Sequence, residues 1–419
     1  MFLSTAPFSI KPLIRIEGSL DSSYENDLQS FIDKFLDSYE DQDEKRYMRY
    51  GYEYYGNILL GKRILLDIIP DIRDVSLFVE HKSLRRYILY RGGRPGCVEP
   101  DKLKHVVKDT LGIKTIIDLR GVAIFEESQL TKDETLSRSI IWKYYNPLFE
   151  NNKIDEYIKI KADEMKKRKD CNNLLINTND QKYVFVLNSL NFREPLKVVS
   201  EEKFDFGSVS NGFSDFIHCL DCTKRNKRHT SENNILNNEL LIEKRKESNM
   251  TIFKSYTYYM LRLISHKYAE NWYIQKYISE KSIGEIYFDF AIFDSMTVSR
   301  ALKIITVSQP PILIHGNLGK DRVSVIVALV LKIVGISDEY IIRDYCASEA
   351  GSLSIKDSID FEMARLPDSI KRCKPEYIQF FFTKLINKFG TIDTYLDEID
   401  FNESWRACLR QKFTENHYN

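Results

Sequence analysis

The stretch PPILIHGNLGKDRVSVIVALVLKIVGIS, residues 310–337, decides the fold. The apolar run Ile312–Ile314 predicts a short buried strand, and the run Val323–Ile336 predicts a buried helix. Between them lies a polar loop, HGNLGKDR, that contains two glycines. Because ligands of parallel α/β sheets bind at the carboxyl ends of the strands, the sequence places this loop where a ligand would bind.

The composition of the loop is typical of an anion site. Gly316 and Gly319 allow backbone angles that turn successive N–H groups inward, and the following helix adds its positive N-terminal end. Arg322 offers a planar fork that matches two phosphate oxygens, and Lys320 adds a second positive charge. A surface turn with incidental charges is the alternative. We predict a phosphate-binding loop made of His315, Gly316, Asn317, Leu318, Gly319, Lys320, Asp321 and Arg322.

Further strand and helix patterns surround this loop. YILYRGGRPG predicts a strand that ends in a turn, EPDKLKHVVKDTLGI a helix from Pro100 to Gly112, and KTIIDLRG a buried strand. Residues 139–149 predict another strand, KYVFVLNSLNF a strand pair, and residues 285–307 a helix. Residues 375–414 predict two or three helices with a stop at Gly390. Alternating strands and helices indicate an α/β fold with a mainly parallel sheet flanked by helices.

The pattern also suggests a domain organisation. Residues 1–80 are expected to form a helical N-terminal extension, with Leu28, Ile32, Phe35 and Tyr39 at helical spacing for packing on the main domain or a partner. Residues 81–150 and 281–419 are expected to form the main domain. Residues 151–280 are expected to be an insertion, partly disordered because 223–250 is rich in Asn, Lys and Glu.

Composition excludes several classes of function. The 61 Lys and Arg residues equal the 61 Asp and Glu residues, so no global charge favours nucleic acid. The seven cysteines lack the spacing of a disulfide framework. The N-terminal residues do not resemble a signal peptide, and the run Val323–Ile336 is shorter than the ~20 residues of a membrane span. We expect a cytoplasmic protein without a transmembrane segment.

The sequence HGNLGKDRV resembles the signature H-C-x-x-G-x-x-R of the tyrosine phosphatase superfamily. It is most similar to the bacterial and fungal branch with H-C-x-x-G-K-D-R-T-G, which includes a secreted mycobacterial phosphatase of proteins and phosphoinositides. YILYRGGRP, LGIKTIIDLRG, GISDEYIIRDYCAS and PEYIQFFFTKLINKFGTIDTYLDE resemble further blocks of that branch in the same order. The resemblance implies a tyrosine-phosphatase-like fold, a phosphorylated ligand, and neither cofactor nor metal.

The resemblance also implies roles for single residues. Asp118 and Arg120 correspond to a segment that lines the family's pocket, although a salt-bridged strand end is an equally good interpretation. Asp321 corresponds to the general acid of active relatives. Arg91 and Arg94 are expected to face solvent rather than the site. Cys97 and Cys346 are expected to be core or loop thiols.

The sequence departs from the family where the chemistry occurs. Gly316 stands at the position of the nucleophilic cysteine, so no phosphocysteine can form there. Val323 stands where the family carries a threonine that helps the thiolate leave, and Ser324 lies one residue late. The sequence therefore predicts a pseudophosphatase that binds a phosphoprotein or a phosphoinositide.

Two alternatives remain open at this stage. In FIHCLDCTKR, Cys219 precedes Arg225 with the spacing of the signature, which offers an atypical nucleophile. In the same segment, Cys219 and Cys222 offer metal ligands together with His218 and His229. We prefer to interpret them as ordinary residues of the insertion. In the second alternative the loop is a relic, and the protein is a scaffold whose partner binds the N-terminal helices or the insertion.

Overall fold

The computed structural model describes residues 29–30, 32–33, 36–37, 39–60, 68–79, 84–95, 100–120, 141, 144–168, 182–187, 281–351 and 372–414. The chain divides into two compact units, Met1–Ser189 with Ser282–Asn419, and Leu190–Lys281. Apart from Lys281, all described residues belong to the first unit.

A six-stranded sheet lies at the centre of this unit, with strand order β1-β2-β6-β3-β5-β4. β2 (Leu89–Gly92), β6 (Ile312–His315), β3 (Thr115–Asp118), β5 (Tyr183–Val186) and β4 (Asn146–Leu148) run parallel, and β1 (Arg73–Asp74) pairs antiparallel with β2. The α/β fold with a mainly parallel sheet is therefore confirmed, and it is consistent with a tyrosine-phosphatase-like architecture.

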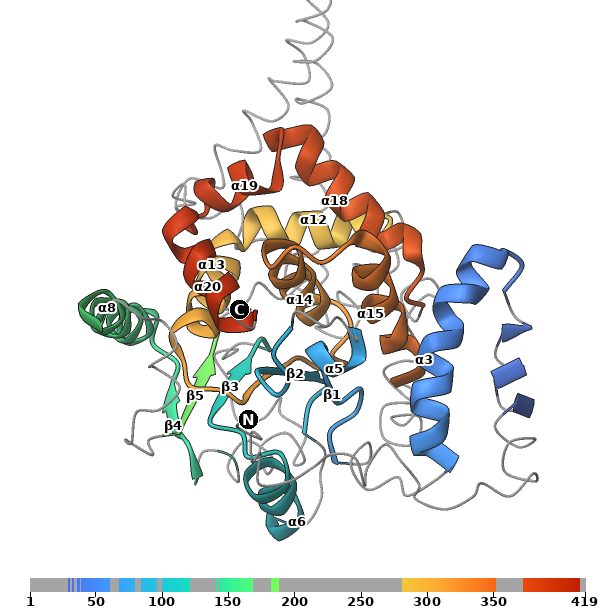
Figure 1. The fold of residues 1–419 in the computed structure, drawn as a ribbon, viewed down its shortest axis with the longest axis horizontal. Coiled ribbons are helices and arrows are strands. Elements are labelled where there is room, and N and C mark those ends of the chain that lie inside the picture. The colour runs from blue at the N-terminus through green and yellow to red at the C-terminus, as the bar shows by residue number, and fades with distance from the viewer. Residues whose placement is uncertain are drawn as a thin grey trace, which may run out of the picture. The chain divides into compact units, whose positions relative to one another are not determined.

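Helices cover the sheet from both sides (Figure 1). On one side lie α12 (Ile283–Phe293), α13 (Ser295–Val307), α14 (Arg322–Ile333), α15 (Asp338–Gly351), α18 (Pro375–Phe389), α19 (Ile392–Glu398) and α20 (Glu403–Phe413). On the other side lies α6 (Pro100–Lys104), which continues into the π-helix η1 (His105–Thr110). α8 (Asn151–Arg168), α5 (Val75–Val79) and α3 (Gln42–Leu60) lie toward the sheet edges.

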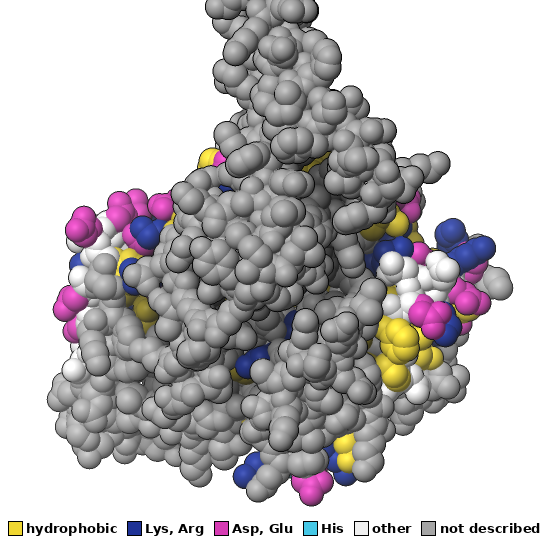
Figure 2. Space-filling model, turned by 180° about the vertical axis from the view of Figure 1, so that it is seen from behind, with side chains coloured by type: hydrophobic (Ala, Val, Ile, Leu, Met, Phe, Trp, Pro, Cys, Tyr) yellow, Lys and Arg dark blue, Asp and Glu magenta, His cyan; other side chains and the backbone are white. Residues whose placement is uncertain are grey.

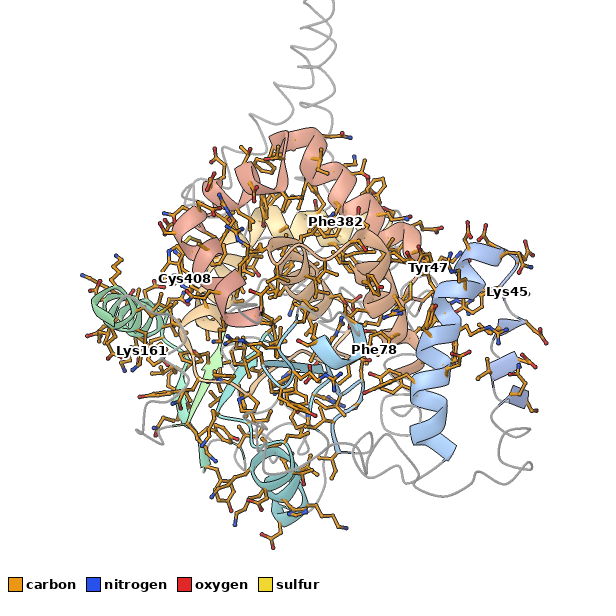
Figure 3. The ribbon with its side chains drawn as sticks, in the orientation of Figure 1. Lys45, Tyr47, Phe78, Lys161, Phe382 and Cys408 are labelled. Carbon is orange, nitrogen blue, oxygen red and sulfur yellow. The ribbon has the colours of Figure 1, made fainter. Side chains whose placement is uncertain are left out.

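The stretch that decides the fold forms the middle of the core. All four residues of β6 are buried, as expected for a central parallel strand that is covered on both faces. α14 is buried on nearly every side, because it lies between the sheet and the other helices of its layer. Figure 3 shows side chains filling the space between these layers, with Phe382 of α18 among them.

Several elements differ in extent from the sequence-based predictions. The strand predicted for 139–149 is limited to Asn146–Leu148. The helix predicted for 285–307 is two helices that meet at Asp294, and the first begins with a capping box between Ser282 and Glu285. The C-terminal segment forms three helices, and Gly390 ends α18 with φ +83°.

Residues beyond 150 also contribute to the sheet. β5 lies inside the sheet between β3 and β4, and the compact unit extends to Ser189. The charged segment 223–250 lies outside the described residues.

The N-terminal helix α3 packs on the main unit through α15. The two backbones approach closely at Gly51, where a Cβ atom would lie 2.6 Å from the Cα of Ala347. Of the predicted apolar stripe before this helix, Ile32 and Tyr39 are buried, while Leu28 and Phe35 lie outside the described residues. Glycine at position 51 allows the two helices to cross in contact.

The surface agrees with the balanced composition. On the face drawn in Figure 2, the described acidic and basic side chains are interspersed. In the part of the chain that the structure describes, no helix has both the length and the apolar character required to cross a bilayer.

A buried lysine ties α20 to the end of α13. The side chain of Lys412 is 5% exposed, and its ammonium donates to the carbonyls of Ile305 (2.6 Å), Thr306 (3.3 Å) and Ser308. These carbonyls belong to the last turn of α13, where helices lack internal donors.

Replacement of Lys412 with methionine should therefore lower the free energy of unfolding. We expect a loss of about 2–3 kcal/mol, because a charged donor is removed from several buried acceptors. Urea titration of the Lys412→Met protein measures this loss, with the exposed Lys159→Met as control. A Lys412→Met protein as stable as the control would contradict the capping role.

Candidate phosphate-binding site

The predicted loop lies at the carboxyl edge of the sheet. β6 ends at His315, which pairs with Gly92 of β2 on one side and with Asp118 of β3 on the other. α14 begins at Arg322, so residues 316–321 connect the strand end to the N-terminus of a twelve-residue helix. This is the location at which parallel sheets bind ligands and at which a helix attracts anions.

The loop is partly buried. His315, Gly316, Gly319 and Lys320 are buried, and Asn317 is exposed. Leu318, Asp321 and Arg322 have intermediate exposure. The loop therefore lies mostly within the fold.

Gly319 must be glycine for two reasons. Its φ is +80°, in the left-handed region that other residues avoid. In addition, a Cβ atom there would lie 2.5 Å from the carbonyl carbon of Gly92. The end of β2 and the loop are thus in direct backbone contact.

Gly316 is different, because its surroundings would accept a side chain. Its φ lies outside the left-handed region, and among the described residues a Cβ there would meet only the Cγ2 of Val323, at 3.5 Å. That separation is ordinary van der Waals contact. The position that corresponds to the family nucleophile therefore has room for a side chain and carries none.

The two residues after Arg322 point to different places. The Val323 methyl group faces position 316, where the family threonine would offer a hydroxyl. The Ser324 hydroxyl instead accepts a hydrogen bond from Arg91, which also binds the carbonyl of Gly319 in the loop. The one-residue offset seen in the sequence thus separates Ser324 from the nucleophile position.

The segment Arg91–Arg94 braces the loop along its length. The amide of Gly316 donates to the carbonyl of Gly92 at 3.4 Å. The amide of Arg94 donates to the carbonyl of Asn317 at 2.9 Å. The guanidinium of Arg91 donates to the carbonyl of Gly319 at 2.7 Å.

The expectation that Arg91 faces solvent is wrong, whereas Arg94 is half-buried. The side chain of Arg91 is fully buried because β2 is an inner strand, covered by β1 at its outer edge and by helices. Its charge is balanced by Asp344 of α15, to which it is bound by an ion pair. Sequence reasoning missed this residue because the strand's neighbours are not evident from its local pattern.

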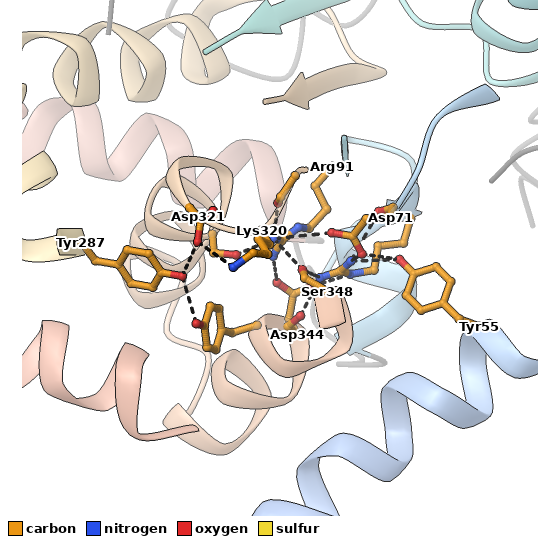
Figure 4. Close-up of polar contacts among 12 residues, drawn as sticks. Tyr55, Asp71, Arg91, Tyr287, Lys320, Asp321, Asp344 and Ser348 are labelled. Carbon is orange, nitrogen blue, oxygen red and sulfur yellow. Dashed lines mark hydrogen bonds and ion pairs between the residues drawn. The ribbon is translucent and has the colours of Figure 1, made fainter. Parts of the chain in front are cut away.

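Arg91 belongs to a buried polar network (Figure 4). Arg73 binds the other oxygen of Asp344 at 2.9 Å and also pairs with Asp71, and Tyr55 of α3 donates to Asp71 at 2.8 Å. Both arginines donate to Ser348 at 3.0 Å. Burial would raise the pKa of Asp344, but Arg73 and Arg91 hold that pKa below its usual value.

Lys320 and Asp321 form a second cluster, and Figure 4 shows it beside the network. The ammonium of Lys320 lies 3.1 Å from Oδ1 of Asp321, and the hydroxyl of Tyr287 donates to the same oxygen at 2.8 Å. The hydroxyl of Tyr345 lies 3.0 Å from the hydroxyl of Tyr287, within hydrogen-bond distance. Burial lowers the pKa of Lys320, but the neighbouring acidic groups, Asp321 first among them, together outweigh burial, and the pKa is raised.

This cluster bears on the predicted role of Asp321. Burial, followed by the charge of Asp321, raises the pKa of Tyr287 well above its usual value, so Tyr287 remains a protonated donor. An Oδ1 atom that accepts from both Tyr287 and Lys320 is not the oxygen that carries a proton. In this structure Asp321 acts as an acceptor that joins α12 to the loop, and its role as an acid stays a prediction.

Asp118 and Arg120 lie next to the loop at the end of β3. Arg120 forms a two-bond ion pair with Asp118 at 2.9 and 2.7 Å. Asp118 also lies 4.0 Å from Nε2 of His315. Arg322 donates to the carbonyl of Leu119 at 3.0 Å. The structure brings these predicted residues together, and their contact with a ligand stays a prediction.

Other predicted residues do not contribute to this picture. Cys346 is a buried core thiol, as expected. Cys97, Cys219, Cys222, His218 and His229 lie outside the described residues. Within the described part of the chain, no group of three or more His, Cys, Asp or Glu side chains is placed to hold a metal ion.

An open polar pocket lies away from the loop, between the starts of α3 and α18. Tyr47, labelled in Figure 3, lies at this pocket. Its lining mixes both signs of charge and includes no residue of the loop, namely Tyr39, Glu40, Asp41, Asp43, Glu44, Arg46, Tyr47, Arg372, Lys374, Pro375, Glu376 and Gln379. The pocket therefore does not extend the candidate site.

Comparison with known proteins agrees with this geometry. Residues 228–415, which include the loop, match the family model described as the tyrosine phosphatase family. No curated protein matches the chain. The match includes β6, the loop and α14, and the mainly parallel α/β sheet is consistent with a tyrosine-phosphatase-like architecture.

Proposed function

We propose that this protein is a pseudophosphatase of the bacterial and fungal branch, which binds a phosphate monoester at residues 315–322 and does not hydrolyse it by the thiol route. The observation that carries the proposal is the pair formed by Gly316 and Val323. Gly316 has no side chain that could act as a nucleophile, and Val323 places a methyl group next to the same position. The proposal keeps the cytoplasmic setting expected from the sequence.

The binding half of the proposal rests on what remains in the loop. The loop precedes the N-terminus of α14, and two of its carbonyls bond to the 91–94 segment. Arg322, the first residue of α14, donates a hydrogen bond to the carbonyl of Leu119. A guanidinium carries five N–H donors in a planar fork, so one anchoring bond is compatible with a bidentate contact to phosphate.

Replacement of Arg322 with alanine should abolish this binding. We expect tungstate, an analogue of phosphate, to bind the natural protein and to lose about 100-fold in affinity in Arg322→Ala, because two charge-assisted hydrogen bonds are lost. Isothermal titration calorimetry measures the affinity. Arg300→Ala, which removes an arginine that pairs with Asp155, is the matched control.

Three results would each point elsewhere. Undiminished binding in Arg322→Ala would exclude this loop as the site. Release of phosphate from p-nitrophenyl phosphate that disappears in Cys219→Ser would favour an active phosphatase with an atypical nucleophile. A natural protein that binds no tungstate would favour a scaffold with a relic loop.

Among the described side chains on the face drawn in Figure 2, acidic and basic groups are interspersed, and this mixture favours a phosphorylated protein over a phosphoinositide. Competition of a phosphotyrosine peptide and of a soluble inositol phosphate against tungstate compares the two ligands. Stronger competition by the inositol phosphate would reverse this preference.

A further inference from the structure

Two carbonyl groups of the loop are held on the side of the 91–94 segment. The carbonyl of Asn317 accepts from the amide of Arg94, and the carbonyl of Gly319 accepts from the guanidinium of Arg91. In a trans peptide the carbonyl and the following N–H point in opposite directions. The amides of Leu318 and Lys320 are therefore turned away from the 91–94 segment.

We infer that Arg91 is a positioning residue, which turns the amide of Lys320 toward the bound anion by holding the carbonyl of Gly319. The inference rests on the proposed function, because it concerns the same loop. Successive N–H groups that face one side form an anion nest. A carbonyl turned to that side would instead repel phosphate.

Gly319 is the residue at which this orientation needs support. Its φ of +80° lies in a region that glycine visits as readily as negative φ, so glycine itself does not fix the adjoining peptide. Contact with Gly92 fixes the position of the residue, and the bond from Arg91 fixes the direction of its carbonyl. The guanidinium supplies the directional restraint.

Arg91 is suited to this task because its own position is fixed. It is fully buried, its Nη1 pairs with Asp344, and its Nη2 donates to Ser324 and Ser348 as well as to Gly319. Lysine at this position could keep one ion pair, but a single ammonium cannot reproduce the planar fork that reaches Asp344 and the loop together.

Arg73 offers a matched control within the same network. It is also buried, and it binds the same Asp344 and Ser348. The bonds that the structure gives for it lead to α3, α15 and Asp71, whereas those of Arg91 also lead to the loop. If the arginines act only by stabilising the network, substitution of either one should have the same effect on tungstate binding. If Arg91 also sets the geometry of the loop, its substitution should have the larger effect.

The test compares Arg91→Lys with Arg73→Lys in the full chain. Tungstate affinity is measured by calorimetry, and the exchange rates of the Gly316 and Arg94 amides are measured without ligand. We expect Arg91→Lys to bind tungstate about 10-fold more weakly and to raise both exchange rates at least about 10-fold. Arg73→Lys should change each quantity less than about threefold.

A second pair of variants, with smaller changes, tests the same inference in case the arginine variants misfold. Ser324 and Ser348 are both buried acceptors of Arg91, and only Ser324 lies near the loop in the chain, two residues after Arg322. Ser324→Ala should weaken tungstate binding by about threefold, while Ser348→Ala should not. Equal effects of the two arginine variants, or of the two serine variants, would overturn the positioning role.

The two readouts separate this inference from the proposed function. A natural protein that binds no tungstate, with amide exchange that still depends on Arg91 and not on Arg73, would contradict phosphate binding and support the positioning of the loop. Exchange rates that are unchanged in Arg91→Lys would overturn the positioning, whatever the protein binds.

Discussion

Replacement of Gly316 with cysteine should convert this protein into a phosphatase that hydrolyses p-nitrophenyl phosphate. The site has room for the new side chain, since a Cβ there meets Val323 at an ordinary contact distance of 3.5 Å. The N-terminus of α14 and Arg322 should lower the pKa of the thiol and so supply the reactive thiolate. p-Nitrophenolate leaves without protonation, so the assay does not require an acid.

The expected gain is at least about 100-fold over the natural protein. Removal of a nucleophile from a hydrolase costs a factor of about a million, and a thiol without tuned neighbours should recover part of that. Gly316→Ala is the control, because it adds the Cβ without the sulfur. Gly316→Cys with Arg322→Ala should be inactive. A Gly316→Cys protein that binds tungstate and releases no phosphate would contradict our placement of the nucleophile.

A second change in that protein tests the role of Val323. Threonine has nearly the shape of valine and can place a hydroxyl near the new sulfur. The hydroxyl should stabilise the thiolate and assist its departure, with a further gain of about 10-fold. Threonine at this position also buries a hydroxyl, so a lower melting temperature should accompany the gain.

Replacement of Asp344 with asparagine should destabilise the fold by about 3–5 kcal/mol, the range observed when one partner of a buried ion pair is removed. Asp344 binds Arg73 and Arg91 on its two oxygens, and all three side chains are buried. Asparagine is nearly the same size, so the loss measures charge and not volume. Urea titration at pH 7 gives the value, with Asp338→Asn at the exposed start of α15 as control.

The difference in stability between the natural and Asp344→Asn proteins should depend on pH. Because the folded state holds the pKa of Asp344 below its ordinary value of 3.8, the stabilisation is fully present above that value and is lost as the pH falls through the folded pKa. The difference in unfolding free energy between the natural and Asp344→Asn proteins should therefore shrink below about pH 4. A constant difference from pH 7 to pH 3 would contradict the assignment.

The fold was predictable from sequence where local patterns are strong. β6 and α14 consist mostly of apolar residues, and the glycines that follow η1 and α18 adopt positive φ, as expected. The glycine at position 316 is also evident in the sequence, because the resemblance to the signature lies in one contiguous block; that it replaces a nucleophile stays a prediction. Each of these features depends on residues close together in the chain.

The support of the loop was not predictable, because it depends on strand order. Arg91 lies more than 220 residues before Gly319, and the parallel pairing of β2 with β6 brings the two together. Asp344 and Tyr287 come from two further helices, α15 and α12. In the sequence, Arg91 lies at the end of a predicted strand, just before a turn, and arginines are usually exposed.

The vacancy at Gly316 has a consequence for the lifetime of a bound phosphate. In an active relative the thiolate and the phosphate dianion carry like charges at short range, and their repulsion opposes binding. Gly316 contributes no such charge, so the same loop should release the ligand more slowly. On the proposed function, slow release would shield the phosphorylated residue of a bound protein from active phosphatases.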